Sequence, residues 1–192
     1  RTLGVPFYAF SHQQGHIAAA LFSSGHMELM DTPHLAWHLS GGTTEAIAVS
    51  PKSYELLGGS ADLHAGQLID RVGVKLGLPF PAGPELEKLA MRGRAQARLS
   101  ASLHGLECHF SGAETKALGW IESGELSPEE IAAETFECVA RTAARLVLAG
   151  CEKSGATQAL LAGGVASSAL LRQLLPARLI RTTSCPEYIS ST

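Results

Sequence analysis

The stretch QALLAGGVASSALLRQLL, residues 158–175, decides the fold of this chain of 192 residues. Its first five residues, 158–162, form a short apolar run, which predicts a buried parallel strand. The pair Gly163-Gly164 follows, and residues 165–175 are predicted to form a helix. A Gly-Gly turn between a strand and a helix exposes backbone N–H groups at a helix N-terminus, a geometry that suits phosphate. The stretch therefore predicts an α/β fold with a ligand site at this turn.

The other elements follow from hydrophobic periodicity and from local start signals. Ser127, Pro128 and Glu130 have the spacing of a capped helix start, so a long helix is predicted to run from there toward Cys151. Small-residue turns between the early strands predict an antiparallel meander. Residues 93–108 have no clear pattern. We expect further strands at 5–10, 34–39, 45–49, 54–57 and 179–183, and further helices at 12–22, 68–77, 85–91 and 113–121.

Composition excludes several classes of protein. The net charge is −3, so bulk electrostatics give no support for nucleic-acid binding. One local basic cluster (Arg92, Arg94 and Arg98, with Lys88 a turn earlier) is best explained as a solvated helix end and loop. No apolar run reaches the roughly 18 residues of a membrane span. The four cysteines are widely spaced, which predicts reduced, mostly buried thiols in a cytoplasmic protein.

A pair of histidines is the first candidate for chemistry. The stretch SHQQGHIAAA, residues 11–20, places His12 and His16 four residues apart, on one face of the predicted helix. Two converging imidazoles make half a metal site, although surface or core histidines have the same spacing more often. Gln13 and Gln14 stand where the glutamate of a zinc protease would be, so a protease of that type is excluded.

Three glycine turns are the second candidate. They lie at residues 40–42, 81–84 and 162–164, and together they favour a nucleotide-type ligand in a cleft, because glycine lets a ligand approach the backbone. None has the pattern of a Rossmann or P-loop site. Asp70 could accept hydrogen bonds from a ribose, or it could form a surface ion pair with the neighbouring Arg71. No nucleophile elbow is present, which disfavours a serine hydrolase.

Taken in order, six motifs resemble the tRNA threonylcarbamoyladenosine transferase family, called TsaD in bacteria and formerly labelled glycoprotease. The resemblance spans nearly the whole chain. The motifs are HQQGH at 12–16, LSGGTT at 39–44, YELLG at 54–58, GQLIDR at 66–71 with LGLPFPAGP at 76–84, FSG at 110–112, and LAGGVA at 161–166.

The resemblance implies the fold of actin, the sugar kinases and the Hsp70-type ATPases, with two ribonuclease H-like lobes around a nucleotide cleft. It implies transfer of a threonylcarbamoyl group from an adenylate to the adenosine beside the tRNA anticodon. By the same resemblance, residues 1–192 are expected to form one truncated two-lobe unit, because the family's N-terminal phosphate-loop segment is absent from this sequence. A similarly folded partner subunit is expected by the same resemblance, and tRNA is implied as the acceptor.

The resemblance also assigns site residues. His12 and His16 would hold a divalent metal, iron or zinc, which polarises the substrate. ATP or an adenylate would be the bound nucleotide. The family's third metal ligand, an aspartate, aligns with Ser191, which weakens the expected metal site. The nucleotide or substrate would contact His38, Leu39, Ser40, Gly41, Gly42, Asp70, Gly83, Gly163, Gly164 and Ser168.

Several positions depart from the family pattern, and they leave two functions open. The first is an active transferase; the second is a degenerate, non-catalytic paralog that binds nucleotide or acts as a scaffold subunit. Retained glycine turns, Asp70 and both histidines support nucleotide binding, whereas the departures support degeneracy. The departing residues are Gln14, Thr43, Gln67, Glu114, Ser168 and Ser191, which replace glutamate, histidine, an acidic residue, lysine, asparagine and aspartate respectively.

Overall fold

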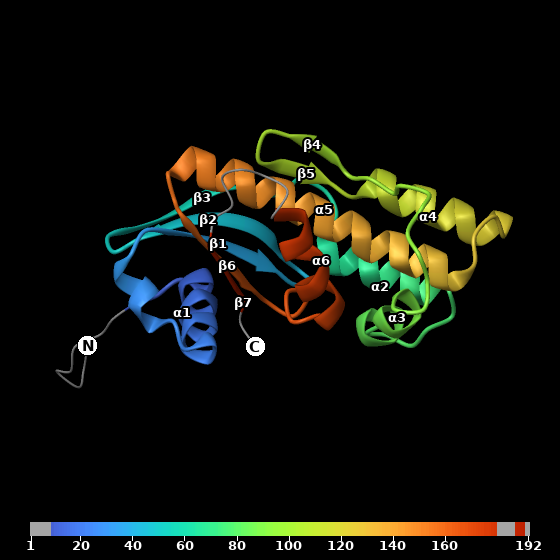
Figure 1. Cartoon of the computed structure of the whole chain (residues 1–192), viewed down its shortest axis with the longest axis horizontal. Helices are drawn as coiled ribbons and strands as arrows, with labels where there is room; N and C mark the ends of the chain where they lie inside the picture. Colours follow the sequence, from blue (N-terminus) through green and yellow to red (C-terminus); the bar gives the residue numbers. More distant parts are fainter. Residues whose placement is uncertain (1–8, 180–186, 191–192) are drawn as a thin grey trace.

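A single seven-stranded sheet forms the centre of the molecule (Figure 1). The structure is a computed structural model that describes residues 9–179 and 187–190. The strand order is β4-β5-β3-β2-β1-β6-β7. The strands are β1 (His34–Leu39), β2 (Thr44–Ser50), β3 (Ser53–Ser60), β4 (Ser102–His104), β5 (Glu107–His109), β6 (Gln158–Ala162) and β7 (Glu187–Ser190).

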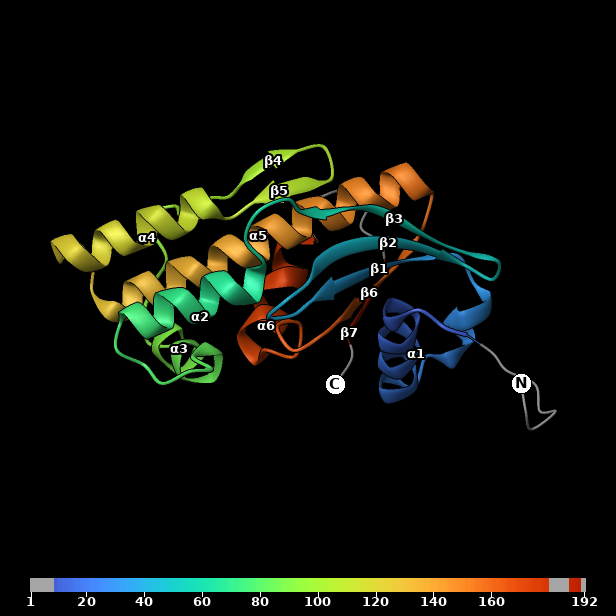
Figure 2. The same cartoon turned by 180° about the vertical axis from the view of Figure 1, so that it is seen from behind.

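Helices cover both faces of this sheet. Figures 1 and 2 show α1 on one side of the strands and α5, the longest helix, on the other. None of the helices in the described residues is long and apolar enough to span a bilayer. The helices are α1 (His12–Ser24), α2 (Ala65–Lys75), α3 (Gly83–Ala90), α4 (Ser111–Ser123), α5 (Pro128–Ser154) and α6 (Ala169–Leu179), with a 3₁₀ turn, η1 (Met27–Asp31).

The predicted meander and the predicted parallel strand are both confirmed. β1, β2 and β3 pair antiparallel, and β6 lies parallel to β1 with Ala162 opposite His38. All six residues of β1 are buried, as a central strand with helices on both faces requires. The Gly58-Gly59 pair does not close β3 as predicted, because the strand continues through it to Ser60 and meets β5.

Side-chain alternation along β1 divides the core into two clusters. Leu35, Trp37 and Leu39 point into the larger cluster, which α2, α4, α5 and α6 complete. Ala36 points the other way, into a smaller cluster formed largely by α1, β2 and β6. Residues of the same parity as Ala36, including His38, therefore face α1.

Local capping explains where α1 and α5 begin. The Ser127 hydroxyl accepts a hydrogen bond from the backbone N–H of Glu130, and the Glu130 carboxylate accepts one from the Ser127 N–H. Ser11 and Gln14 make the same reciprocal pair at α1. Both predicted helix starts are confirmed, because each capping box lies within four consecutive residues.

Four predicted helix starts are wrong. α2 begins at Ala65 rather than at 68, and α3 begins at Gly83 rather than at 85. α6 begins at Ala169 rather than at 165, because the Val165 N–H donates to the Leu39 carbonyl and ties this segment to the end of β1. α4 begins at Ser111 rather than at 113, because a distant carboxylate, Asp62, caps it.

Three strand predictions also need comment. β4 and β5 form a short hairpin over residues 102–109, most of which lies in the stretch 93–108 where the sequence shows no pattern. For the strand predicted at 179–183, Leu179 is instead the last residue of the helix α6. Residues 180–183 lie outside the described residues. Residues 5–8 of the predicted strand 5–10 also lie outside them, and residues 9 and 10 are irregular.

Candidate functional site

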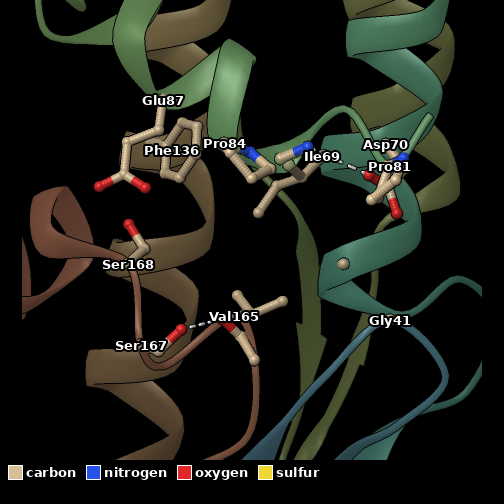
Figure 3. Close-up of a pocket in the computed structure, with 13 residues that line it drawn as sticks. Gly41, Ile69, Asp70, Pro81, Pro84, Glu87, Phe136, Val165, Ser167 and Ser168 are labelled. Atoms are coloured by element: carbon tan, nitrogen blue, oxygen red, sulfur yellow. Dashed lines mark hydrogen bonds between the residues drawn. The ribbon is translucent and has the colours of Figure 1, made fainter. Parts of the chain in front are cut away.

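A pocket of about 340 Å³ opens at the carboxyl ends of β1 and β6, on the α5 side of the sheet (Figure 3). Its size lies within the range typical of small-molecule sites. One wall comes from the β1–β2 turn and α2, another from the segment before α6, and α3 and α5 close the rest. The lining residues are Gly41, Gly66, Ile69, Asp70, Pro81, Gly83, Pro84, Glu87, Phe136, Gly164, Val165, Ser167 and Ser168.

Half of the predicted nucleotide-binding residues line this pocket. They are Gly41, Asp70, Gly83, Gly164 and Ser168, which come from four separate segments. The other half, His38, Leu39, Ser40, Gly42 and Gly163, are not among the lining residues. His38 and Leu39 belong to the buried strand β1 itself, so they sit behind the pocket rather than in its wall. Nucleotide binding by either set stays a prediction.

Asp70 fixes the loop that forms one rim. Its Oδ1 accepts hydrogen bonds from the backbone N–H groups of Ala82 (2.8 Å) and Gly83 (3.2 Å). Arg71 does not pair with Asp70; its Nη1 forms an ion pair with the Glu114 carboxylate of α4 at 3.2 Å. The surface ion pair that was the alternative explanation of Asp70 is therefore excluded. Asp70 holds the loop and faces the pocket.

Two glycines let the pocket walls approach each other. A Cβ on Gly66 would lie 2.6 Å from the Gly41 Cα and 2.7 Å from the Ser40 carbonyl oxygen. A Cβ on Gly163, whose φ is +102°, would lie 2.3 Å from the Leu39 carbonyl oxygen. Both contacts are with backbone, which cannot move aside as a flexible side chain can. Any larger residue at these positions would push α2 or the α6 segment away from β1.

The far wall contains Glu87, which the sequence did not reveal, beside the predicted residue Ser168. Glu87 accepts a hydrogen bond from the Leu170 N–H (2.8 Å), and the Ser168 hydroxyl accepts one from the Leu171 N–H (3.1 Å). Figure 3 shows the Glu87 carboxylate pointing toward the segment of Ser168. The first turn of α6 is thus satisfied by side chains rather than open to phosphate. Glu87 lies four residues after Gly83, on the same helical face, which is the signal that could have found it.

The histidine pair lies beyond the end of β1, on the α1 side of the sheet. The Nε2 atoms of His12 and His16 are 2.9 Å apart, so one ring donates its N–H to the other. His38 packs on His16, with ring centroids 4.6 Å apart. Burial lowers the pKa of His38, and charge on His16 and His12 lowers it further. His12 and His16 lie on one face of α1 with their rings in contact, as the spacing predicts, and their role as metal ligands stays a prediction.

The family metal can be tested against these donors. The two Nε2 atoms converge, and His38 has a buried Nδ1 with no hydrogen-bond partner in the described structure. The donor chemistry therefore suits a transition metal such as zinc or iron. The positions of the side chains, however, do not form a metal site, because no three His, Cys, Asp or Glu residues within 9–179 and 187–190 are arranged to hold a metal ion. Ser191, the aligned third position, lies outside the described residues.

A family model described as TsaD, tRNA N6-adenosine threonylcarbamoyltransferase, matches residues 1–191. The chain belongs to this family.

Curated TsaD relatives are longer than this chain. The tRNA N6-adenosine threonylcarbamoyltransferase of Thermus thermophilus is 39% identical, over 88% of this chain and 51% of that protein. The same enzyme of Corynebacterium diphtheriae is 35% identical, over 91% and 54%. A probable bifunctional tRNA threonylcarbamoyladenosine biosynthesis protein of Thermoplasma volcanium is 34% identical, over 91% and 32%. The chain thus spans about half the length of the first two relatives, and less of the third.

Solved structures confirm the predicted fold class, whereas the two-lobe organisation of residues 1–192 stays a prediction. HypF from T. kodakarensis superposes with a TM-score of 0.76 at 15% identity, over 92% of this chain and 33% of that one. Component A of (R)-2-hydroxyglutaryl-CoA dehydratase from Acidaminococcus fermentans gives 0.56 at 16% identity, over 90% and 60%. At such identities the likeness concerns the fold alone. This TsaD-family chain has the α/β architecture of the actin-like ATPases.

Three departures from the TsaD pattern have structural roles here. The Gln14 side-chain oxygen accepts from the Ser11 N–H at 2.7 Å, and that of Gln67 accepts from the His64 N–H at 3.0 Å, so both amides cap helices. Glu114 pairs with Arg71. Each of these three residues is therefore integrated into the fold.

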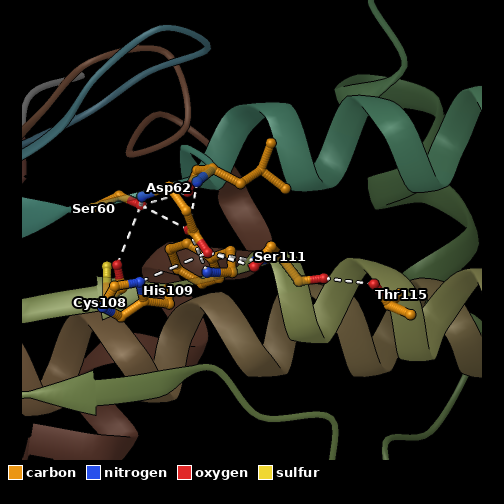
Figure 4. A network of polar contacts seen from close by, with 8 residues as sticks. Ser60, Asp62, Cys108, His109, Ser111 and Thr115 are labelled. Atoms are coloured by element: carbon orange, nitrogen blue, oxygen red, sulfur yellow. Dashed lines mark hydrogen bonds and ion pairs between the residues drawn. The ribbon is translucent and has the colours of Figure 1, made fainter.

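A second polar network surrounds Asp62, outside the pocket (Figure 4). The Asp62 carboxylate accepts from the Phe110 N–H (2.8 Å), the Ser111 N–H (3.2 Å) and the Ser111 hydroxyl (2.5 Å). His109 lies 3.8 Å from the same carboxylate. The Ser111 hydroxyl thus donates to a carboxylate rather than to a histidine ring, so the arrangement is a helix cap and not a hydrolase triad. Asp62 therefore caps the start of α4, although it lies just before α2 in the sequence.

Proposed function

We propose that this chain binds an adenosine nucleotide in the pocket between α2, α3 and α6. We further propose that it serves transfer of a threonylcarbamoyl group from an adenylate to tRNA adenosine. The observation that carries the proposal is the convergence of Gly41, Asp70, Gly83 and Gly164 on one pocket in a chain of the TsaD family. Ligands of open α/β sheets bind outside the carboxyl ends of the strands, where this pocket lies.

The pocket offers complementary groups for a nucleoside. Asp70 uses Oδ1 to hold the rim loop, so its Oδ2 is the atom that would accept hydrogen bonds from ribose hydroxyls. Ile69 and Phe136 supply apolar surface for a base. Gly41 and Gly66 bring backbone close to the ligand without side-chain obstruction. Glu87 and Asp70 make the pocket acidic, which favours the hydroxyl- and amine-bearing part of the nucleotide over its phosphates.

The metal is a separate part of the proposal. His12 and His16 would hold a divalent ion, iron or zinc, at the same end of β1 as the pocket. When bound, such an ion acts as a Lewis acid that polarises a carbonyl oxygen of the transferred group. The chain's own contribution is to hold the two imidazoles on α1, whose buried residues Ile17 and Leu21 anchor it to the sheet.

Calorimetric titration with AMP and with a stable threonylcarbamoyl-adenylate analogue tests nucleotide binding. We expect saturable binding at one site, weakened at least tenfold in Asp70→Asn. Glu122→Gln is the matched control, because Glu122 is an exposed carboxylate paired with Lys75 outside the pocket. Absence of binding by the wild-type protein, or equal binding by Asp70→Asn, would contradict the proposal.

The non-catalytic alternative is favoured by one specific observation. By the resemblance, the family has charged residues of another kind where this chain has Gln14, Gln67 and Glu114. In this chain the three side chains make structural contacts. A transfer assay separates the alternatives: the purified protein, its adenylate and an unmodified tRNA are combined, and the nucleosides are analysed by mass spectrometry. Nucleotide binding without threonylcarbamoyladenosine would support a binding or scaffold subunit.

The acceptor and the partner are proposed on family grounds. Relatives are named for tRNA modification, and the Thermoplasma relatives are described as bifunctional. We expect tRNA to approach the open side of the pocket, and a similarly folded subunit to be required for full activity. Adding the candidate partner to the transfer assay checks this; unchanged turnover would contradict the partner requirement.

A further inference from the structure

A second cavity, of about 400 Å³, lies between α5, α6 and the segment that follows α3. It shares no lining residue with the pocket proposed for the nucleotide. Its volume is within the range typical of small-molecule sites. Residues from three separate parts of the chain meet in its lining, so only the folded protein has this cavity.

The segment 93–99, between α3 and β4, is fixed to α5 at both ends. A Cβ on Gly93 would clash with the Glu129 carbonyl oxygen, so the backbone at this end rests directly on α5. At the other end, the buried Glu134 carboxylate accepts hydrogen bonds from the N–H groups of Arg98 (3.1 Å) and Leu99 (2.8 Å). Figure 1 shows the segment after α3 crossing α5. The residues between the two anchors therefore have a fixed position along the cavity.

α6 gives the cavity its apolar side. Leu171, Leu175 and Leu179 of this helix are buried in the large core. Leu170 and Leu174 are only partly buried, and they line the cavity. Their spacing of four residues places both on one face of the helix. A hydrocarbon chain that covered this face would remove apolar surface from water, which is favourable.

The charged side chains of the lining leave one guanidinium unpaired. The Glu137 carboxylate, 5% exposed, pairs with Arg178 and, at 3.9 Å, with Arg141. The buried Nε of Arg178 has no hydrogen-bond partner in the part of the chain that the structure describes. Arg94 is exposed, and its guanidinium forms no ion pair or hydrogen bond with any residue of 9–179 or 187–190. A guanidinium in this state can bind a carboxylate or a phosphate through paired hydrogen bonds.

A neighbouring hollow contains the other charges near Arg94. Arg94 borders it together with Arg92, Glu129 and Glu130. The Glu130 carboxylate is held by the capping box at the start of α5. With Arg141 included, the two hollows have four arginines and three glutamates, so one positive charge remains without an acidic counterpart. The cavity therefore favours an anion.

We propose that this cavity binds a small anion with an aliphatic body, a monocarboxylate or an alkyl phosphate. The Arg94 guanidinium takes the anionic head, and Leu170 and Leu174 cover the chain. The inference goes beyond the proposed function, because it requires neither the nucleotide nor the metal.

Calorimetric titration of the purified protein with butyrate, hexanoate and octanoate tests the site. We expect one site per chain and an affinity that rises about two- to fourfold with each added CH₂ group, because the chain buries apolar surface. Hexyl phosphate, compared with hexanoate, shows which head group is preferred. Hexylamine has the same body with a positive charge, and it should bind about tenfold more weakly than hexanoate, or less. Methyl NMR shifts at Leu170 and Leu174 locate the bound chain.

Arg94→Gln should weaken hexanoate binding about tenfold, because it removes a hydrogen-bonded charge from the head group. Arg92→Gln is the matched control: it removes the same charge two residues away, from a side chain that lines only the neighbouring hollow. Both arginines are exposed, so we expect both variants to fold like the wild type. The control should bind hexanoate like the wild type.

Four results would overturn the inference: no binding of the acids or of hexyl phosphate, hexylamine binding as tight as that of hexanoate, equal affinities in the Arg94 and Arg92 variants, or displacement of hexanoate by saturating AMP. The last result would place the anion in the nucleotide pocket. AMP binding is measured separately on the same proteins. Its absence would remove the proposed function, whereas hexanoate binding that depends on Arg94 would still support this inference.

Discussion

At the residue scale, Asp62 shows how one carboxylate can join segments that are far apart in sequence. It follows β3 and accepts hydrogen bonds from Leu63, Phe110 and Ser111. Burial alone would raise the pKa of Asp62, but the hydrogen bonds from Ser111, Leu63 and Phe110 lower it to about 2. The ionised carboxylate is therefore the form that the fold stabilises, at the positive end of α4.

Asp62 should make stability depend on pH in a defined window. Because its folded pKa of about 2 lies below the unfolded value of about 3.9, its contribution is complete above pH 4 and disappears as the pH falls toward 2. We expect Asp62→Asn to lower the free energy of unfolding by about 2 kcal/mol at pH 7. Urea denaturation between pH 2 and pH 7 measures this. A difference from wild type that is equally large at pH 2 would contradict it.

Two thiols should be unreactive in the folded protein. Burial raises the pKa of Cys108 and of Cys138 to about 11, so almost no thiolate is present at pH 8. We expect both to resist a thiol reagent such as DTNB until urea unfolds the chain. Mass spectrometry assigns each labelled site, which separates them from Cys185, outside the described residues. Rapid labelling of Cys138 in the native protein would contradict the buried position on α5.

At the element scale, helix starts that are capped by neighbouring residues could be predicted from the sequence, whereas a start that is capped from a distant segment could not. The start of α5 was predictable because Ser127 and Glu130 satisfy each other within one turn. The start of α4 was not, because its cap comes from Asp62, 49 residues before Ser111. Likewise Asp70 was found in a motif, whereas Phe136 reaches the pocket from a helix face that only tertiary packing selects.

The contact between α2 and the β1–β2 turn gives an element-scale prediction. Gly66→Ala would place a methyl group 2.6 Å from the Gly41 Cα, so α2 or the turn must move. We expect at least a tenfold loss of nucleotide affinity, together with lower stability. Gly119→Ala in α4 is the control: its Cβ meets nothing within 4 Å, and alanine in a helix should stabilise by about 0.5–1 kcal/mol.

Titration with AMP and thermal unfolding of both glycine variants give the comparison. If Gly66→Ala binds AMP with wild-type affinity, the turn can move away from α2 without changing the pocket, and the prediction is wrong.

At the scale of the whole molecule, the sheet separates a large core from a small one. The large core surrounds α5, whose central residues, such as Phe136, Val139 and Leu146, are almost completely buried. The small core beneath α1 contains fewer large side chains, which are Ile17, Leu21, Leu29, Ile47, Val49 and Leu160. Because buried apolar area sets resistance to local opening, the two faces should differ in stability.

Hydrogen exchange should reveal this difference. We expect backbone amides of α1 to exchange by local opening, at lower free energy than those of the middle of α5, which should need global unfolding. Exchange followed by mass spectrometry on peptides from 12–24 and 131–147 makes the measurement. Equal protection of both helices would show that the two cores open as one unit.

The position of β1 between the two candidate sites has a thermodynamic consequence. The His38 side chain points from β1 toward α1, and Gly41, in the turn that follows β1, lines the pocket. If one ligand shifts β1, each ligand must alter the affinity of the other by the same factor, whichever binds first. Trp37 is fully buried on β1, so its indole emission, measured in a Trp120→Phe variant that lacks the other tryptophan of the chain, reports that reciprocity.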